Sequence, residues 1–228
     1  MKKRRLLLAD YDTAAHGLWT LCALKVTKAP QVQTLVNVPG RYAPLDQSDY
    51  LTDGQPYYGN ATLNASLESS EGSHSERQAR IDAMRDHLDG RSIRIVHPDH
   101  PDHYMIGRVQ IQQEYNDLAH CCVSITAVCD PWFYRTEETV VELTATDAEQ
   151  TVDLLNSGRL AVVPTVIVTG SVKMSYNSNI WNLENAQYFL PDLCLLPGSA
   201  YGQPGVHSVT YSGAGTVEIR YREAVLAG

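Results

Sequence analysis

The chain has 228 residues and a formal net charge of −8 at pH 7, from 18 basic and 26 acidic side chains. A chain of this length buries enough surface to need no disulfide staples, so we expect one large domain or two modest ones. The acidic balance excludes a protein that wraps nucleic acid through a basic face, and no apolar run approaches the length of a membrane span.

The first part of the chain predicts two short apolar segments joined by a turn. The run from Leu6 to Tyr11 indicates a strand, and a second apolar stretch extends from Leu18 to Val26. After it, Val32–Val38 predicts another short strand that runs directly into Pro39-Gly40. Because proline has no N–H and glycine tolerates positive φ, the chain must leave its sheet there. We expect a departing polar loop from there to Gln55.

A clean alternation of apolar and polar residues follows, which is typical of a half-buried strand. Its apolar members are Ala61, Leu63, Ala65 and Leu67.

Residues 75–89 predict a helix, the only convincing one in the sequence. Ser75 and Gln78 fit a capping box, with Ser75 as the N-cap residue. Gly90 is suited to the position after the last turn. A single apolar stripe must pack on a sheet or close the end of a barrel. The stripe consists of Ile81, Met84 and Leu88.

The next part of the chain predicts a β-hairpin and then a long strand. Residues 92–97 and 103–112 form the two hairpin strands, and a turn at 114–117 leads to a strand over 119–129. Pro131 cannot donate a hydrogen bond into a sheet, so pairing should stop near it.

From residue 136 the sequence has no helical periodicity and contains short apolar runs separated by turn residues, a pattern that favours a β-sandwich. We place a domain boundary near Arg135, which gives domains of 1–135 and 136–228. The expected strands are 138–143, 151–155, 160–168, 172–176, 179–183, 187–190, 207–211 and 216–221.

The cysteines are odd in number and have no C-x-x-C spacing. We expect five reduced, mostly buried thiols in a protein assembled in the cytosol. Cys121 and Cys122 are adjacent in an expected strand, so they should point to opposite faces. The five are Cys22, Cys121, Cys122, Cys129 and Cys194.

Three histidines and two aspartates between His97 and His103 raise the question of a metal site. Two prolines in the same run predict a tight reversal that splays the side chains, so we interpret it as a solvated hairpin tip. No nucleophile elbow, phosphate-binding loop or paired thiol and base is present. We therefore expect no enzyme, no cofactor and no metal.

The segment around Pro39-Gly40 also carries a recognisable pattern, formed by Pro30, Val32, Thr34, Val38, Pro39, Gly40, Arg41, Leu45 and Asp46. With these residues the chain resembles a known family, the distal tail proteins of long-tailed, non-contractile phages. That family has a Pro-Glu-x-x-Thr strand and then a Val-Pro-Gly-Arg-x-Gly-x-Leu-Asp loop. The chain departs from the pattern at Gln31, in place of the acid, and at Ala43, in place of the second glycine.

Further matches follow in the family's order along nearly the whole chain, each of them weak by itself. They are Gly107-Arg108-Val109, Asp130-Pro131-Trp132, Asn156-Ser157-Gly158 and the run from Gly213 to Arg222.

The resemblance implies a mainly β protein: an N-terminal β-barrel or sandwich with one packed helix, followed by a C-terminal galectin-like β-sandwich. It implies a homo-hexameric ring at the distal end of a virion tail, assembled in the host cytoplasm. The ring would join the tail tube protein to the tail tip hub or baseplate and anchor side proteins, such as tape-measure or receptor-binding proteins, while DNA only passes through the channel.

Ring closure needs two different patches on each subunit. The long loop and the hairpin tip are the candidates for contact with a neighbour, through Pro39, Gly40, Arg41, Leu45, Asp46, Asp99 and His100.

Two alternatives stay open at this point. One is a carbohydrate-binding adhesion module that stacks sugars on Trp181, Tyr188 and Tyr201. The other is a tail-tube-type ring protein of an injection or gene-transfer particle, because ring folds of this kind are shared.

Overall fold

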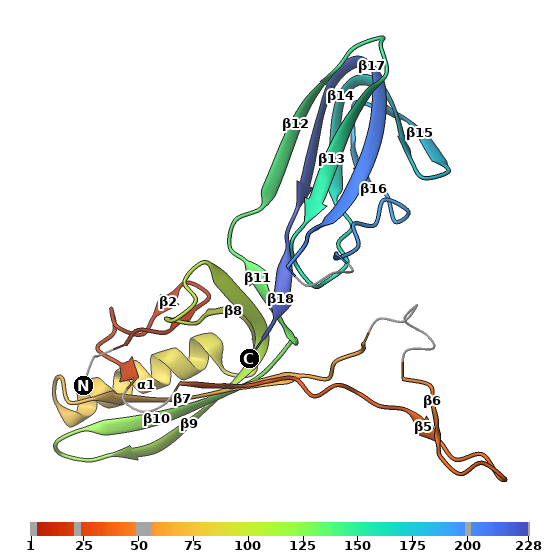
Figure 1. Ribbon diagram of the computed structural model, residues 1–228. Helices are drawn as coiled ribbons and strands as arrows, with labels where there is room; N and C mark the ends of the chain where they lie inside the picture. Colours follow the sequence, from red (N-terminus) through yellow and green to blue (C-terminus); the bar gives the residue numbers. More distant parts are fainter. Residues whose placement is uncertain (1–3, 21–23, 49–55, 199–201, 228) are drawn as a thin grey trace. The chain divides into compact units, whose positions relative to one another are not determined.

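The computed structural model describes residues 4–20, 24–48, 56–198 and 202–227 (Figure 1). It consists of two compact units. Unit 1 contains the described residues up to Phe133 together with Leu226 and Ala227, and unit 2 runs from Tyr134 to Val225. The expected boundary near Arg135 falls in the strand that connects the two. The last described residues return to unit 1, so the second domain does not continue to the end of the chain.

Unit 1 is built on an antiparallel sheet in the order β2-β1-β8-β9-β10-β7-β3, with β4 also paired to β7 and β11 to β9. Strand β11 pairs with β18 (Ala224–Leu226), through which the chain returns. The elements are β1 (Leu7–Leu8), β2 (Tyr11–Asp12), β3 (Trp19–Thr20), β4 (Lys25–Thr27), β5 (Leu35–Val36), β6 (Leu45–Asp46), β7 (Ala61–Ser69), α1 (His74–Leu88), β8 (Ser92–Val96), β9 (His103–Asn116), β10 (Cys121–Cys129) and β11 (Trp132–Arg135).

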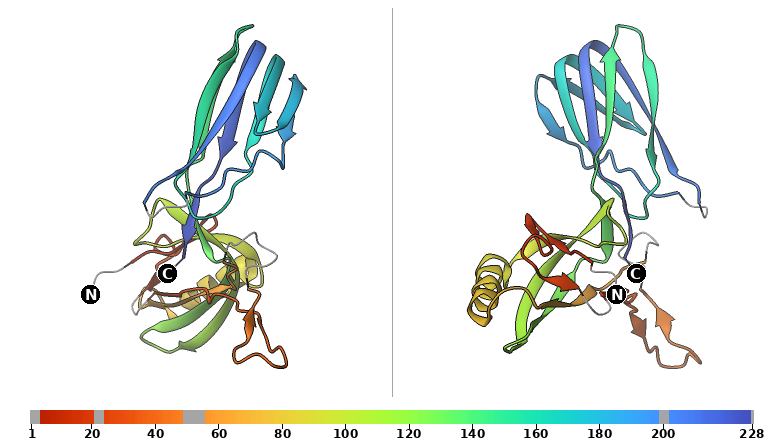
Figure 2. Two further views of the ribbon diagram at one scale, coloured as in Figure 1. Left: turned by 45° about the vertical axis from the view of Figure 1, so that its right-hand side comes forward. Right: turned by 90° about the vertical axis from the view of Figure 1, so that its left-hand side faces the viewer.

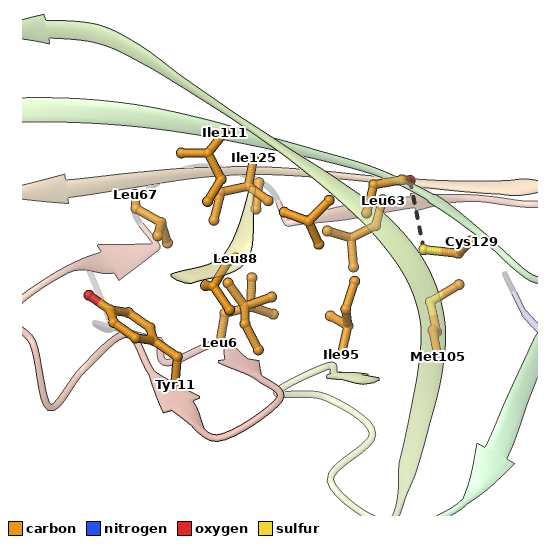
Figure 3. Close-up of a cluster of buried hydrophobic side chains, with 14 of the residues drawn as sticks. Leu6, Tyr11, Leu63, Leu67, Leu88, Ile95, Met105, Ile111, Ile125 and Cys129 are labelled. Atoms are coloured by element: carbon orange, nitrogen blue, oxygen red, sulfur yellow. Dashed lines mark hydrogen bonds between the residues drawn. The ribbon is translucent and has the colours of Figure 1, made fainter. Parts of the chain in front are cut away.

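The predicted alternation in β7 is confirmed, since its four apolar side chains are buried while the intervening residues are not. Because successive strand residues point to opposite faces, all four reach the same core. Figure 3 shows Leu63 and Leu67 from β7 in one cluster with Leu6, Leu88 and Ile95. The core of unit 1 is thus closed by the N-terminal segment, α1 and the sheet together.

The expected single strand from Leu6 to Tyr11 is in fact a tight hairpin of β1 and β2. Leu7 pairs with Asp12 and Leu8 with Tyr11. The reversal is made at Ala9, which has a positive φ of 56°. The run contains neither glycine nor proline, and the turn-forming residue Asp10 is the only sign of a reversal in it.

Helix α1 begins at His74, one residue before the predicted range, and its N-cap is Ser73 rather than Ser75, two residues earlier. The Ser73 hydroxyl accepts a hydrogen bond from the Glu76 backbone N–H (3.4 Å), and the Glu76 carboxylate accepts one from the Ser73 backbone N–H (2.7 Å). Gln78 instead bonds the side chain of Gln113 on β9. Both serines precede a Glu or Gln by three residues, so the pattern alone fits either start.

The predicted apolar stripe of α1 is confirmed: Ile81, Met84 and Leu88 are buried. Gly90 has the expected positive φ, at 72°. Arg77 is buried as well, with 2% of its surface exposed, which the sequence pattern did not indicate.

Unit 2 contains a six-stranded antiparallel sheet in the order β12-β17-β14-β15. Strand β13 also pairs with β17, and β16 with β14. The strands are β12 (Thr139–Ala145), β13 (Gln150–Asn156), β14 (Thr165–Tyr176), β15 (Asn179–Glu184), β16 (Gln187–Phe189) and β17 (Gly205–Tyr221).

The two longest strands of unit 2, β14 and β17, replace what was expected to be four short ones. Gly170 pairs with Gly215, and both have positive φ, as does Gly213. Gly170 lies between two expected strands and Gly213 and Gly215 lie between two others, but they bend two continuous strands at the same register. Buried residues from both sides of the bend belong to one core, so the sheet folds over a single face (Figure 2): Val166, Val168, Val172, Met174, Val209, Tyr211, Val217 and Ile219.

The described cysteines are free thiols, and Cys22 lies outside the described residues. Cys121, Cys122 and Cys129 are buried, whereas Cys194 is only half-buried. Burial raises the pKa of the Cys129 thiol to about 11, so this sulfur stays protonated at neutral pH. Within the described chain, no helix has both the length and the apolar character needed to span a bilayer.

Candidate assembly interface

Residues 30–48 form a two-stranded arm that leaves the main sheet of unit 1 (Figure 1). At its root, the Val32 N–H donates to the Tyr57 carbonyl and the Gly59 N–H to the Pro30 carbonyl, both at 2.9 Å. Farther out, β5 pairs with β6, and the Gln47 N–H donates to the Thr34 carbonyl at 2.8 Å. The expected strand therefore exists as β5, and it pairs with β6 rather than with the main sheet.

The sequence explains where the arm leaves and where it turns. Strand β4 pairs with β7 as far as Thr27, and Pro30, which has no N–H to donate, stands at the root. At the tip, Gly40 has a φ of +84° and the Arg41 N–H donates to the Val38 carbonyl at 3.2 Å. The Pro39-Gly40 pair thus makes the reversal, because this kind of turn needs a residue with positive φ, and glycine adopts it readily. The outer part of the predicted loop, residues 49–55, lies outside the described residues.

The arm exposes apolar side chains that have no place in the core of unit 1. No residue of the described arm belongs to that core, although Ala29 just before it does. A two-stranded ribbon without a covered face is marginally stable in water, and contiguous exposed apolar side chains mark interaction sites. The exposed residues are Val32 (39%), Leu35 (55%), Val36 (38%), Val38 (38%) and Tyr42 (111%).

Five of the seven predicted interface residues lie together in this arm. Pro39, Gly40 and Arg41 form its tip, and Leu45 and Asp46 form β6. Leu45 faces Val36 and Asp46 faces Leu35 across the ribbon.

The two charged side chains among these five are in different situations. The Asp46 carboxylate accepts hydrogen bonds from the Ser48 hydroxyl and from the Ser48 backbone N–H, and these bonds lower the pKa of Asp46 below its ordinary value. The bonds to Ser48 thus hold the Asp46 side chain within the arm as an ionised carboxylate. Arg41 is exposed, and no described side chain pairs with it. It is therefore the cation that the arm offers to another surface.

The other two predicted residues, Asp99 and His100, lie in a separate turn between β8 and β9. The Asp99 carboxylate accepts a hydrogen bond from Arg4 at 2.9 Å, and the His100 ring lies at a tilt against that of Phe133, with 5.3 Å between the ring centroids. Both are thus engaged by contacts within their own chain. The structure does not combine them with the arm into one cluster.

The histidines of this turn do not form a ligand set. His97, interpreted as part of a solvated tip, is 7% exposed, and its Nδ1 accepts the Asp99 backbone N–H at 3.1 Å. Burial lowers the pKa of His97, against the opposing effect of Asp99. Among the described residues, no group of three or more His, Cys, Asp or Glu side chains is placed to hold a metal ion.

The aromatic residues considered for sugar stacking are differently placed. Trp181 and Tyr188 are half-buried and pack against the core of unit 2. The Tyr188 hydroxyl also donates to the Glu184 carbonyl at 2.9 Å. Tyr201 lies outside the described residues. A ring packed on a core has less face left for a sugar, so these positions carry no argument for a glycan site.

One exposed element was missed by sequence reasoning, the turn between β9 and β10. We expected this turn at residues 114–117, whereas the reversal lies between Asp117 and His120 and carries Leu118, which is 94% exposed. The available signal was an apolar residue inside an Asn-Asp turn, where a polar one is usual.

The comparisons with known proteins give a structural relative but no sequence relative. No protein-family model matches the chain, and no curated protein matches it at a significant level. Among solved structures, the crystal structure of the SPP1 Dit protein, described as a paradigm of the hub adsorption apparatus in phages that infect Gram-positive bacteria, matches with a TM-score of 0.65. The match covers 99% of this chain and 100% of that one at 13% identity. The chain therefore shares the fold of that phage protein over its whole length.

Proposed function

We propose that the chain is a structural protein of a phage tail that closes into a ring, with six copies as the expected number, at the distal end of the tail. In this role it joins the tail tube to the tail tip or baseplate and anchors side proteins. Of the two units, unit 2 is the galectin-like domain. DNA passes through the channel without being bound.

The arm carries this proposal. It exposes apolar residues along a ribbon that has no core of its own, and such a ribbon gains stability by packing on another chain. A projecting element on one side of a subunit is suited to a heterologous contact, and repeated heterologous contacts close into rings.

Two further observations support the proposal. The fold matches that of a phage hub protein across both units, although at 13% identity the likeness concerns the fold alone. The net charge of −8 also fits a channel protein, since like charge reduces adhesion of the passing nucleic acid.

Shortening the arm tests the proposal. The Thr34 carbonyl accepts the Gln47 N–H at 2.8 Å, so the ends to be joined are already paired. We replace residues 35–46 by Asn-Gly, which suits a two-residue hairpin turn. The variant should keep its melting temperature and lose ring formation in light scattering and negative-stain imaging.

A matched control is available in Ile180→Arg, which changes an apolar side chain that is 62% exposed on β15 of unit 2. This variant should assemble like the unmodified chain. A shortened-arm variant that still forms closed rings would refute the role of the arm.

A further inference from the structure

The turn between β9 and β10 presents an isolated apolar side chain on a rigid base. Leu118 is 94% exposed and Tyr115 41%. The Asp117 backbone N–H donates to the His120 carbonyl at 2.9 Å. The Asp117 carboxylate accepts the backbone N–H groups of Ala119 (2.8 Å) and His120 (2.7 Å). The backbone on both sides of Leu118 is therefore fixed by hydrogen bonds.

A buried arginine braces this turn from the helix side. Arg77, 2% exposed, donates to the carbonyls of Gly72 and Asp117, both at 2.6 Å, and to the Asn116 side chain at 3.4 Å. Burying a guanidinium is costly unless its donors are satisfied. Here the donors hold a surface turn in place. A turn whose backbone is already fixed loses less conformational entropy when a partner binds. The turn that carries Leu118 is therefore suited to bind another chain.

Acidic groups lie beside the apolar residues of this turn. The Tyr115 hydroxyl donates to the Glu68 carboxylate at 3.5 Å, and the Asp117 side chain is 55% exposed. The His120 ring meets that of Tyr115 edge-on, with 5.9 Å between the ring centroids. We call the surface formed by Tyr115, Leu118 and His120 with the neighbouring Glu68 and Asp117 the β9–β10 tip. It offers an apolar centre with an acidic rim.

The β9–β10 tip and the arm lie at opposite ends of the sheet of unit 1 (Figure 1). Ser69 at the end of β7 pairs with Cys121, next to the tip, whereas Ala61 at its start pairs with Cys129, next to the root of the arm. The nine residues of β7 span roughly 26 Å at about 3.3 Å per residue. The two surfaces are therefore separate and face away from each other.

We propose that the β9–β10 tip is the surface that receives the arm of the neighbouring copy. The inference rests on the proposed ring, for which it supplies the second patch. The apolar arm residues Leu35 and Val36 pack around Leu118, and Arg41 pairs with the acidic rim. The occupant is a second copy of this chain, because the arm has the matching apolar character and carries at its tip an exposed cation, Arg41, opposite in charge to the acidic rim. Opposite ends of one subunit then give a head-to-tail contact, which a ring requires.

A mixing experiment isolates this contact. One variant, Leu118→Arg, keeps the arm but has a defective tip. The other, the shortened-arm chain described above, keeps the tip but has no arm. Because Leu118 is almost fully exposed, its replacement should leave the melting temperature within about 2 °C of the unmodified chain.

Neither variant alone can form an arm-to-tip pair, but the two together can form one. We expect each variant alone to scatter light as a monomer, close to the 25.3 kDa of the unmodified chain for Leu118→Arg and ten residues lighter for the shortened-arm chain. An equimolar mixture should give a dimer with the summed mass of the two variants and nothing larger. Adding Ile180→Arg to either variant should leave the dimer unchanged.

The outcomes separate this inference from the proposed function. If the unmodified chain forms rings and Leu118→Arg also forms them, the tip is not the receiving surface, while the ring proposal stands. If both variants are monomeric and their mixture stays monomeric, the pairing of arm with tip is refuted. If the unmodified chain is monomeric at every concentration, both proposals fail.

Discussion

The bend in β14 and β17 depends on Gly170, and the substitution Gly170→Ala measures how strongly. Gly170 has a φ of +101°, and an added Cβ would lie 2.3 Å from the Ala214 carbonyl oxygen and 2.8 Å from the Gly215 Cα. Both atoms belong to the backbone of the adjacent strand, so they cannot rotate away as the end of a side chain would.

Two costs contribute to the expected loss. A positive φ costs a non-glycine residue roughly 1–2 kcal/mol, and overpacking adds roughly 1–3 kcal/mol. We expect the free energy of unfolding of unit 2 to fall by about 3 kcal/mol. For a domain of this size, that corresponds to a decrease in Tm of roughly 12–24 °C.

Differential scanning calorimetry of the whole chain provides the assay, with Gly202→Ala as the control. Gly202 also has a positive φ, +74°, but no heavy atom lies within 4 Å of an added Cβ. The control should therefore lose only the conformational part, about 1 kcal/mol. Equal melting temperatures for the two variants would refute the reasoning that the close approach of the strands constrains Gly170.

Three further substitutions test individual contacts. Arg77→Met removes the donor to the carbonyls of Gly72 and Asp117 and should lower the free energy of unfolding, measured in urea, by about 3 kcal/mol. A decrease below about 1 kcal/mol contradicts the bracing role. Burial lowers the pKa of His97, so the unfolded chain binds that proton first and stability falls as pH drops below about 6.5. His97→Gln should flatten this dependence relative to His74→Gln, a control at an exposed histidine away from His97, and an unchanged pH profile contradicts it. Tyr176→Phe removes a 2.7 Å hydrogen bond to His207 Nδ1 and should cost about 1–2 kcal/mol by calorimetry; an unchanged Tm contradicts it.

The spacing of apolar residues correctly predicted the elements that bury one face and expose the other. The alternation in β7 and the stripe of α1 follow directly from burial on one face, so their core residues were identified from spacing alone. The N-cap was placed at Ser75 because two overlapping capping boxes fit the sequence. Only the contact between Ser73 and Glu76 decides between them.

Glycine was the main source of error in unit 2. The segments that contain Gly170, Gly213 and Gly215 were expected to separate short strands, because glycine beside apolar runs usually marks a turn. In the structure they bend long strands where two backbones approach closely. A single sequence does not distinguish a turn from a bend, because both require positive φ.

The candidate interface was predictable in part. The Pro39-Gly40 pair located the arm, since its chemistry demands a reversal, and five predicted residues lie in it. The exposure of Leu35 and Val36 was not predictable, because apolar residues in a strand are normally buried. The β9–β10 tip was missed because Leu118 depends on a distant residue, Arg77, for its presentation.

The ring is tested most directly by the native mass of the unmodified chain, measured by light scattering during size-exclusion chromatography, with negative-stain imaging of the same peak. We expect six copies of the 25.3 kDa chain and a closed ring with a central hole. A single chain at every concentration, or a two-fold symmetric dimer, would contradict a head-to-tail ring.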